Sequence, residues 1–227
     1  MKKFHLLLAG VLLALGTGVA SANEAYDSDR GLYFDVGFAK AAKPTDKVLN
    51  SFKIADATGG GGEYIDLRVG WYSSPFTNSV GSRVYGQIWN NSQKNEIGVG
   101  IGGVAETQLG NSDFTAYFGG SFGIGRQKVK GKERDVKNLT TGMSHIVGVP
   151  NWNGKMVHDD NTVVYDFTLH LGTAYYITKN MSVDLAYESK FRYYNLKYHP
   201  SGANWNYTSI NTSAWEHAVR LGLTYRF

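Results

Sequence analysis

Apolar and polar residues alternate with a period of two along most of this chain. In the stretch GLYFDVGFAK, positions 32 to 38 place Leu, Phe and Val on the even numbers and Tyr, Asp and Gly on the odd ones. Similar stretches occur at residues 31–40, 63–72, 83–89, 97–102, 114–124, 163–172, 183–192 and 217–227. A period of two indicates β-strands with one continuous apolar face and one mixed face. We therefore expect an all-β fold with eight strands.

The connections between these stretches alternate in length. The short ones are residues 72–80, 105–113 and 176–180, and the long ones are residues 41–61, 127–161 and 194–214. Only residues 90–94 break the long series. Short turns at one end and long loops at the other are typical of outer-membrane barrels, with the turns in the periplasm and the loops outside. The pattern predicts an eight-stranded antiparallel up-and-down transmembrane β-barrel.

The direction in which the apolar face points separates a membrane barrel from a soluble one. A soluble barrel such as a lipocalin would turn its apolar face inward. Here the mixed face is rich in glycine, alanine, serine and threonine, which suit a narrow lumen. Aromatic residues beside the short turns resemble an interfacial girdle; they are Trp71, Tyr72, Tyr175 and Tyr176. We expect the apolar face to contact lipid.

Residues 1–22 have the features of a secretory signal peptide. Lys2 and Lys3 precede an apolar run at residues 6–19, and Ala20-Ser21-Ala22 provides a cleavage site. We therefore expect export through a cleaved signal peptide. Residues 23–227 would then form one barrel domain in an outer membrane.

Composition argues against several other classes of protein. Without Lys2 and Lys3, the 23 basic residues fall to 21 against 19 acidic ones, a balance that gives no reason to expect a nucleic-acid partner. The chain has no cysteine, which excludes disulfides and zinc–thiolate sites. The G-x-G-x-x-G pattern at residues 98–103 lies within a strand and does not precede a helix. His158-Asp159-Asp160 has no second ligand cluster at a suitable spacing. We expect neither a cofactor nor a metal.

The C-terminal third of the chain resembles a known family. The segments YDFTLHLGTAYYITKNMSVDLAYESKF and EHAVRLGLTYRF are similar to the last three strands of small outer-membrane barrels related to the opacity proteins and to the OmpA transmembrane domain. The resemblance implies an eight-stranded monomer in the outer membrane of a Gram-negative bacterium. It also implies that Leu223, Tyr225 and Phe227 form the signal read by the barrel-assembly machinery. The chain departs from the opacity proteins in its short second loop, residues 90–94.

Charged residues on the mixed faces are expected to fill the lumen. The acidic set is Asp35, Asp66, Asp166, Asp184, Glu188 and Glu216, and the basic set is Arg68, Arg83, Lys190, Arg192, Arg220 and Arg226. Buried charges are tolerated only when they are paired, and eight strands enclose little more than side chains. We therefore expect an ionic plug centred on Asp35, Glu188 and Arg220. The alternative is a gate, in which a switch of ionic partners opens a narrow pore.

His170 is also expected in the lumen, level with Asp184 or Glu188. An imidazole beside a carboxylate can serve as a general base. The predicted register places no serine nucleophile beside it, so the sequence favours a structural histidine over a catalytic one.

The long loops carry the residues expected to contact other molecules. The basic ones are Lys128, Lys130, Lys132 and Arg134, and the aromatic ones are Trp152, Tyr198 and Trp205. Basic loops suit anionic lipopolysaccharide or an acidic host glycan, and aromatic residues are common anchors in binding surfaces. The same residues are also compatible with a solvated loop surface or with loops packed above the barrel.

The sequence thus favours a surface-exposed, non-enzymatic envelope protein acting through its long loops. The expected role is adhesion, host interaction or envelope integrity. The expected partners are outer-membrane lipid, lipopolysaccharide and a host-surface protein or glycan. A narrow pore for ions or small solutes is the alternative, and a lipid-modifying enzyme is the third possibility.

Overall fold

The computed structural model describes residues 30–42, 62–76, 80–93, 95–128, 134–135, 155–158, 161–200 and 208–227. The expected signal peptide and most of the long loops lie outside these residues. The strands are β1 (Arg30–Ala41), β2 (Glu63–Ser73), β3 (Gly81–Asn91), β4 (Glu96–Gln108), β5 (Phe114–Lys128), β6 (Arg134–Asp135), β7 (Lys155–His158), β8 (Asn161–Tyr176), β9 (Met181–Pro200) and β10 (Thr208–Arg226). Across these ranges, no helix is long and apolar enough to span a bilayer.

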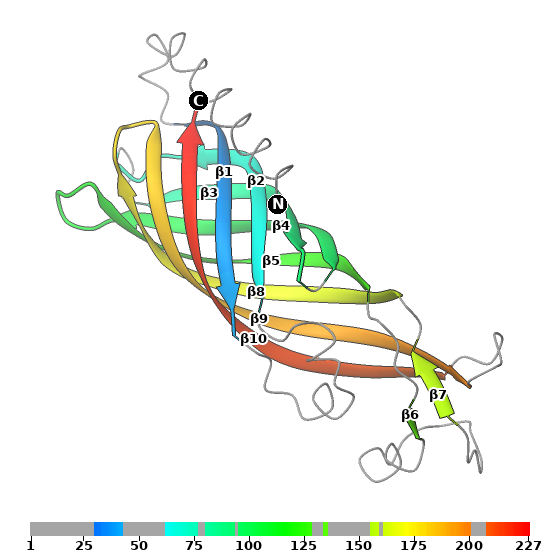
Figure 1. The fold of residues 1–227 in the computed structure, drawn as a ribbon. Coiled ribbons are helices and arrows are strands. Elements are labelled where there is room, and N and C mark those ends of the chain that lie inside the picture. Colours follow the sequence, from blue (N-terminus) through cyan, green and yellow to red (C-terminus); the bar gives the residue numbers. More distant parts are fainter. Residues whose placement is uncertain are drawn as a thin grey trace.

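Eight of these strands close into an antiparallel barrel. Neighbours in sequence pair along β1–β5, then β5 pairs with β8, β8 with β9 and β9 with β10. β10 also pairs with β1, with Phe38 opposite Leu221, so the sheet has no open edge within the barrel (Figure 1). The predicted up-and-down topology and strand number are confirmed.

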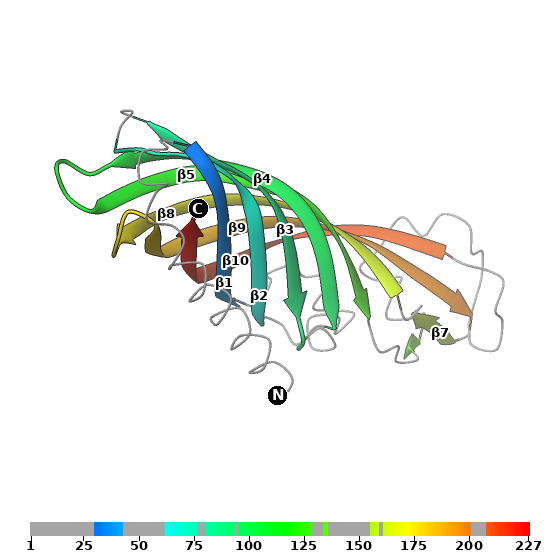
Figure 2. The same cartoon turned by 90° about the horizontal axis from the view of Figure 1, so that it is seen from above.

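β9 and β10 extend further beyond the barrel than the sequence predicts. β9 continues to Pro200 and β10 begins at Thr208, so most of the expected long loop at residues 194–214 is strand, and that expectation was wrong. β7 pairs with the last residues of β9, Tyr198 to Pro200, and β6 pairs with β7, beyond the point where β8 begins (Figures 1 and 2). The added segments of β9 and β10 include Tyr194, Tyr198, Thr208, Ile210 and Thr212, residue types that favour extended pairing.

The two faces of the barrel show the exposure pattern of a membrane protein. Outward side chains are large and apolar, with Ile101 70% and Trp71 66% exposed. Inward charged groups are hidden, with Asp35 2% and Arg220 0% exposed. A soluble barrel would show the reverse. The apolar face therefore points to lipid, as predicted.

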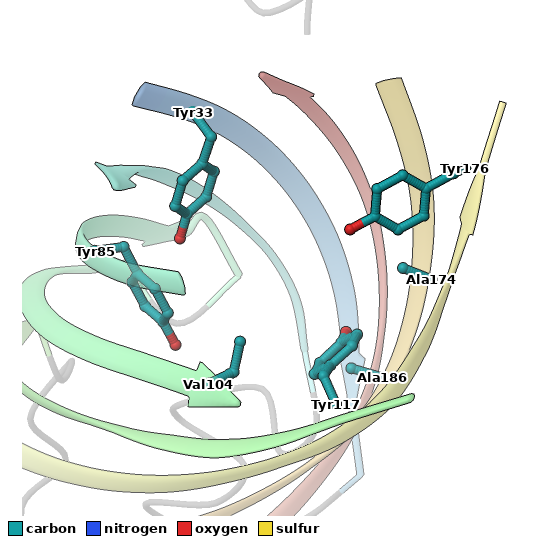
Figure 3. Close-up of a cluster of buried hydrophobic side chains, with 7 residues drawn as sticks. All are labelled: Tyr33, Tyr85, Val104, Tyr117, Ala174, Tyr176 and Ala186. Atoms are coloured by element: carbon teal, nitrogen blue, oxygen red, sulfur yellow. The ribbon is translucent and has the colours of Figure 1, made fainter. Parts of the chain in front are cut away.

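The two ends of the barrel differ in their connections. Short turns follow β2, β4 and β8, and the chain enters β1 and leaves β10 at this same end, which we call the short-turn end (Figure 1). We call the opposite end the long-loop end. Near the short-turn end, inward tyrosine rings fill the lumen together with small side chains (Figure 3); the cluster is Tyr33, Tyr85, Val104, Tyr117, Ala174, Tyr176 and Ala186.

Candidate functional site: the charged lumen

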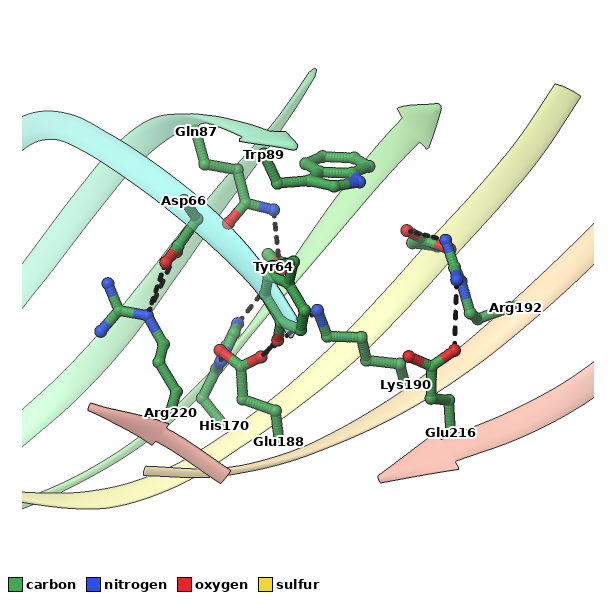
Figure 4. Close-up of polar contacts among 12 residues, drawn as sticks. Tyr64, Asp66, Gln87, Trp89, His170, Glu188, Lys190, Arg192, Glu216 and Arg220 are labelled. Atoms are coloured by element: carbon green, nitrogen blue, oxygen red, sulfur yellow. Dashed lines mark hydrogen bonds and ion pairs between the residues drawn. The ribbon is translucent and has the colours of Figure 1, made fainter. Parts of the chain in front are cut away.

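Arg220 of β10 is fully buried in the lumen and binds three carboxylates. Its Nε is 2.9 Å from Asp66 Oδ1, its Nη1 is 2.9 Å from Asp184 Oδ1, and its Nη2 contacts Asp35. Thr224 donates a further hydrogen bond of 2.8 Å to Asp35 Oδ2. The three carboxylates come from β2, β9 and β1, so a single guanidinium ties together the strands on both sides of the closure (Figure 4 shows its bond to Asp66).

Two glycines make room for this guanidinium. A Cβ on Gly37 would overlap the side chains of Arg220 and Asp66, and a Cβ on Gly222 would overlap Arg220 Nη1. Small inward residues are therefore needed where the Arg220 guanidinium and its carboxylates lie against the wall of the barrel. The glycine-rich inward rows are thus a packing requirement of the ionic plug.

A second group of charges surrounds Glu188 of β9. Arg68 joins the two groups, because its Nε is 2.7 Å from Asp66 Oδ2 and its Nη2 is 2.9 Å from Glu188 Oε1. Lys190 Nζ lies 3.3 Å from Glu188 Oε2 and 3.7 Å from the centre of the Tyr64 ring, whose hydroxyl donates to Glu188 (Figure 4). The structure thus divides the expected single cluster of Asp35, Glu188 and Arg220 into two clusters linked by Arg68. Arg220 binds Asp35 and Asp184, whereas Glu188 belongs to the second cluster.

His170 lies in a chain of hydrogen bonds that the sequence did not predict. Its Nδ1 is 3.1 Å from Glu188 Oε1, and its Nε2 is 3.0 Å from Ser121 Oγ and 3.2 Å from Tyr85 OH. The expectation that no serine lies beside His170 was wrong: Gly119 is the direct partner of His170, and Ser121 reaches the ring as a diagonal neighbour.

The order Ser121–His170–Glu188 is that of a catalytic triad, but its surroundings do not suit a substrate. The adjoining cavity has a volume of about 10 Å³, enough for one water molecule. Ser121 is 5% exposed and His170 1% exposed. This arrangement can hold a water molecule or relay a proton, whereas acyl transfer requires room for an acyl group beside the serine.

A third cluster lies nearer the long-loop end, around Arg192 of β9. Its Nε is 2.8 Å from Asp166 Oδ1, its Nη1 is 3.2 Å from Glu216 Oε2, and its Nη2 contacts Glu96. Trp89 Nε1 donates a hydrogen bond of 2.9 Å to Glu96 Oε1. One guanidinium thus again holds several strands together, here β4, β8, β9 and β10.

The fourth cluster closes the lumen at the short-turn end. Arg83 Nε donates to Glu106 Oε2 at 2.9 Å, while Thr115 and Tyr176 donate to Glu106 Oε1 at 2.5 and 2.9 Å. Arg226 Nη2 donates to the Tyr176 hydroxyl at 2.6 Å. This layer is built from residues near the short-turn ends of β3, β4, β5, β8 and β10.

Glu96 and Glu106 were missing from the predicted lumen set. Both are 2% exposed and bind arginines inside the barrel. The predicted strand covered only residues 97–102, whereas β4 runs from Glu96 to Gln108. The signal was present, because the inward parity of Gly98, Gly100 and Gly102 continues to both glutamates.

Two members of the predicted aromatic girdle point the wrong way. Tyr176 is 6% exposed and binds Glu106 inside the lumen, and Tyr72 packs against the inward tyrosine cluster, with the Arg226 guanidinium 5.5 Å from its ring centre. Trp71 and Tyr175 do face outward, at 66% and 44% exposure. In two consecutive aromatic residues of a strand only one can face lipid, so the girdle prediction was wrong for Tyr72 and Tyr176.

The remaining predicted residues fall into two groups. Phe227 is half exposed, its backbone N–H donates to the Leu32 carbonyl at 2.9 Å, and its ring lies 4.9 Å from that of the buried Tyr225. Leu223 is opposite Val36 of β1. The side chains of the predicted loop contacts are not among the described parts of the structure; the residues are Lys128, Lys130, Lys132, Arg134, Trp152, Tyr198 and Trp205. The backbone of Lys128, Arg134 and Tyr198 belongs to β5, β6 and β9, so the prediction that these three lie in loops was wrong.

The fold and the lumen together define a small outer-membrane β-barrel with a side-chain-filled, charged interior. No protein-family model matches the chain, and no curated protein matches it. Solved structures with a related fold include Neisserial surface protein A, at 13% identity and a TM-score of 0.43, covering 88% of this chain and 98% of that one.

Two further solved structures belong to the same kind of barrel. A major outer membrane protein from Thermus thermophilus has 11% identity and a TM-score of 0.41, with 86% and 99% of the two chains covered. Outer membrane protein W of E. coli has 14% identity and a TM-score of 0.35, with 87% and 97% covered. At such identities the likeness concerns the fold alone.

Proposed function

We propose that the barrel is a plugged scaffold and that its long-loop end acts at the cell surface, in adhesion, host interaction or envelope integrity. The observation that carries this proposal is the filled lumen. Ionic clusters around Arg220, Glu188 and Arg192 cross it at successive levels, and each of its two described cavities has a volume of about 10 Å³. A lumen packed in this way leaves the loops as the part of the molecule available to large partners.

The proposal includes how the protein reaches and sits in the membrane. Residues 1–22 are removed on export, and the strand bearing Leu223, Tyr225 and Phe227 is read by the assembly machinery. The folded chain is a monomer whose outward apolar face contacts outer-membrane lipid. Lipopolysaccharide and a host protein or glycan meet the loops.

Basic residues of the third long loop provide the test of a surface role. We expect the double variant Lys130→Gln, Lys132→Gln to lower binding of whole cells to an acidic glycan such as heparin several-fold, because charge attraction steers such contacts. The matched control is Lys47→Gln, Lys53→Gln in the first long loop, which should bind like the wild type. Equal binding by both variants and the wild type would rule out this loop as the contact surface.

A narrow pore is the second candidate, and one observation favours it. Arg68 lines both small cavities of the lumen, one shared with His170 and Glu188 and the other with Tyr33 and Asp184. Its guanidinium lies 5.0 Å from the Tyr85 ring centre and bonds to Asp66 and Glu188. Arg68 is therefore the side chain whose movement would join the two cavities. A lipid-modifying activity ranks third, because the space beside Ser121 is so small.

Bilayer conductance separates the scaffold from the pore. The refolded wild type should insert without conductance steps, since the clusters seal the lumen. Arg68→Ala should produce small, reproducible steps because it removes the side chain between the two cavities, whereas Arg126→Ala on the outer face should stay silent. Steps from the wild type itself would overturn the plugged scaffold and make the pore the preferred function.

A further inference from the structure

β10 extends well beyond the end of its neighbour β1. Their last residue pair is Ala41 with Ala218, and one more bond of 2.7 Å joins the Ala42 N–H to the His217 carbonyl. β10 starts well before that bond (Figure 1). Within the described residues, no strand pairs with residues 208–215 on the side of β10 that β1 occupies further along. We call this stretch the β10 edge.

The backbone groups of the β10 edge point in known directions. In an antiparallel sheet, successive residues of a strand turn their N–H and C=O groups alternately to its two neighbours. His217 and Phe227 bond to the β1 side, whereas the Arg226 N–H donates to Asn180 on the β9 side at 2.7 Å. β9 and β10 pair without a bulge, so this alternation holds along the whole of β10. The residues whose donors and acceptors face the open side are therefore the odd-numbered ones; they are Ser209, Asn211, Ser213 and Trp215.

The sequence of the β10 edge favours pairing with a further strand. Natural proteins commonly protect an edge strand by lysine, by proline or by keeping it short. TSINTSAW, residues 208–215, contains no lysine, arginine, proline or glycine, and its threonines and isoleucine favour extended pairing. A strand of this length runs for about 25 Å. The edge can thus form a ladder of several hydrogen bonds.

The β10 edge continues the seam between β1 and β10. A strand added there would lie in line with β1 and antiparallel to β10. In the register of this seam, the residue of a prolonged β1 that comes opposite Trp215 is Pro44, which has no backbone N–H. The sequence therefore interrupts the β1 ladder where the β10 edge begins, and a strand from another chain is the better complement.

Trp215 provides a contact for an apolar side chain on such a strand. It faces outward, is 46% exposed, and its ring centre lies 5.3 Å from that of Phe191 on β9. A residue opposite Trp215 on the added strand would lie on the same face of the sheet, where aromatic cross-strand pairs are stabilising. The sequence places no charge at the other odd-numbered positions of the edge. Recognition would thus rest on backbone bonds and on Trp215.

We propose that the β10 edge is a docking site for an extended segment of a partner protein, which pairs antiparallel to β10 in line with β1. In this mode of recognition, backbone hydrogen bonds supply the affinity and side chains at alternate positions select the partner. The inference rests on the proposed role of the long-loop end at the cell surface. It assigns this part of the surface to a protein rather than to a glycan.

The probe is a fluorescent peptide with the sequence of residues 189–198, SKFRYYNLKY, added to the refolded full barrel in detergent micelles. In the structure this sequence already pairs antiparallel with residues 208–217 from the β9 side. We expect saturable binding by fluorescence anisotropy. Ser213→Pro should weaken it about tenfold, because it removes an N–H of the open side, where proline is tolerated. Ser213→Ala is the matched control and should bind like the wild type.

Two N-methylated forms of the peptide test the direction of pairing on the wild-type barrel alone. On the β10 edge, the odd-numbered residues of the peptide would turn their N–H groups to β10. Methylation of the backbone nitrogens of Phe191 and Tyr193 should abolish binding, whereas methylation at Arg192 and Tyr194 should leave it unchanged. This comparison decides the question if Ser213→Pro does not fold.

Several results would overturn the docking site. They are no peptide binding by the wild type, equal binding of the two methylated peptides, or equal binding by folded Ser213→Pro and Ser213→Ala. Binding that appears only after deletion of residues 45–59 would mean that the first long loop occupies the edge. Dimerisation of the wild type that Ser213→Pro abolishes would assign the edge to a second copy, and either result would exclude a free docking site. Heparin binding by whole cells uses other residues, so normal heparin binding beside any of these results would reject the edge and leave the surface role standing.

Discussion

Arg220→Ala is expected to prevent stable folding of the barrel, or to lower its free energy of unfolding by about 3–5 kcal/mol. The change removes a cation that contacts Asp35, Asp66 and Asp184, all of which are at most 2% exposed. Asp35 and Asp184 would then lose the cation that they share, while Asp66 would keep its ion pair with Arg68. The measurement is urea unfolding in lipid vesicles, followed by the difference in gel migration between folded and heated protein.

The control for Arg220→Ala is an arginine that faces the other way. Arg126 is an exposed residue of β5, and Arg126→Ala should change the free energy of unfolding by less than about 1 kcal/mol. Adding Asp35→Asn and Asp184→Asn to Arg220→Ala should restore part of the lost stability, because the carboxylates no longer repel each other. Wild-type stability in the single variant would contradict the central role of this cluster.

The barrel was predictable from the sequence because the alternation of apolar and polar residues identifies each strand and the direction of its side chains. Once one inward residue of a strand is known, the parity fixes all the others. Asp35, Arg68, Asp166 and Arg220 were placed in the lumen by this rule, and the structure buries each of them. The rule failed only where strand ends were drawn too early, as for Glu96 and Glu106 in β4.

The partners of each charge were less predictable than its location. Pairing depends on the stagger between strands, which shifts side chains up or down relative to their neighbours. Glu188 was expected beside Arg220, but the register sets Ala186 opposite Arg220 and brings Asp184 to it instead. Ser121 reaches His170 as a diagonal neighbour for the same reason. The alternation of residues along a strand shows which side chains point into the lumen. To predict which of them become partners, the stagger between neighbouring strands must also be known.

The height of β8, β9 and β10 is a further feature that alternation alone did not reveal. At the long-loop end these strands pair with each other, and β9 also pairs with β7. The polar residues there therefore belong to strands, although the sequence resembles a loop. Backbone pairing satisfies these segments without an apolar face. The long-loop end therefore presents an extended sheet edge as well as loops.

Ile101→Arg tests the most general conclusion, that the outer wall of the barrel contacts lipid. Ile101 is 70% exposed, and it lies midway along β4 with Gly86 and Phe122 opposite it. On the surface of a soluble protein, an arginine at such a position would be nearly neutral. At the midplane of a bilayer it is expected to lower the free energy of unfolding by about 2–4 kcal/mol.

The matched control for Ile101→Arg is Leu109→Arg, in the short turn that follows the same strand. Leu109 is 46% exposed, and at the membrane boundary an arginine should cost only about 0–1 kcal/mol. Both variants leave the lumen clusters intact, so a difference between them reports depth in the membrane rather than damage to the plug.

Urea unfolding in vesicles measures the two free energies. Equal, small effects would mean that the exposed apolar band does not lie in lipid, and the membrane assignment would fail, whereas a large loss confined to Ile101→Arg requires hydrocarbon around the middle of the barrel.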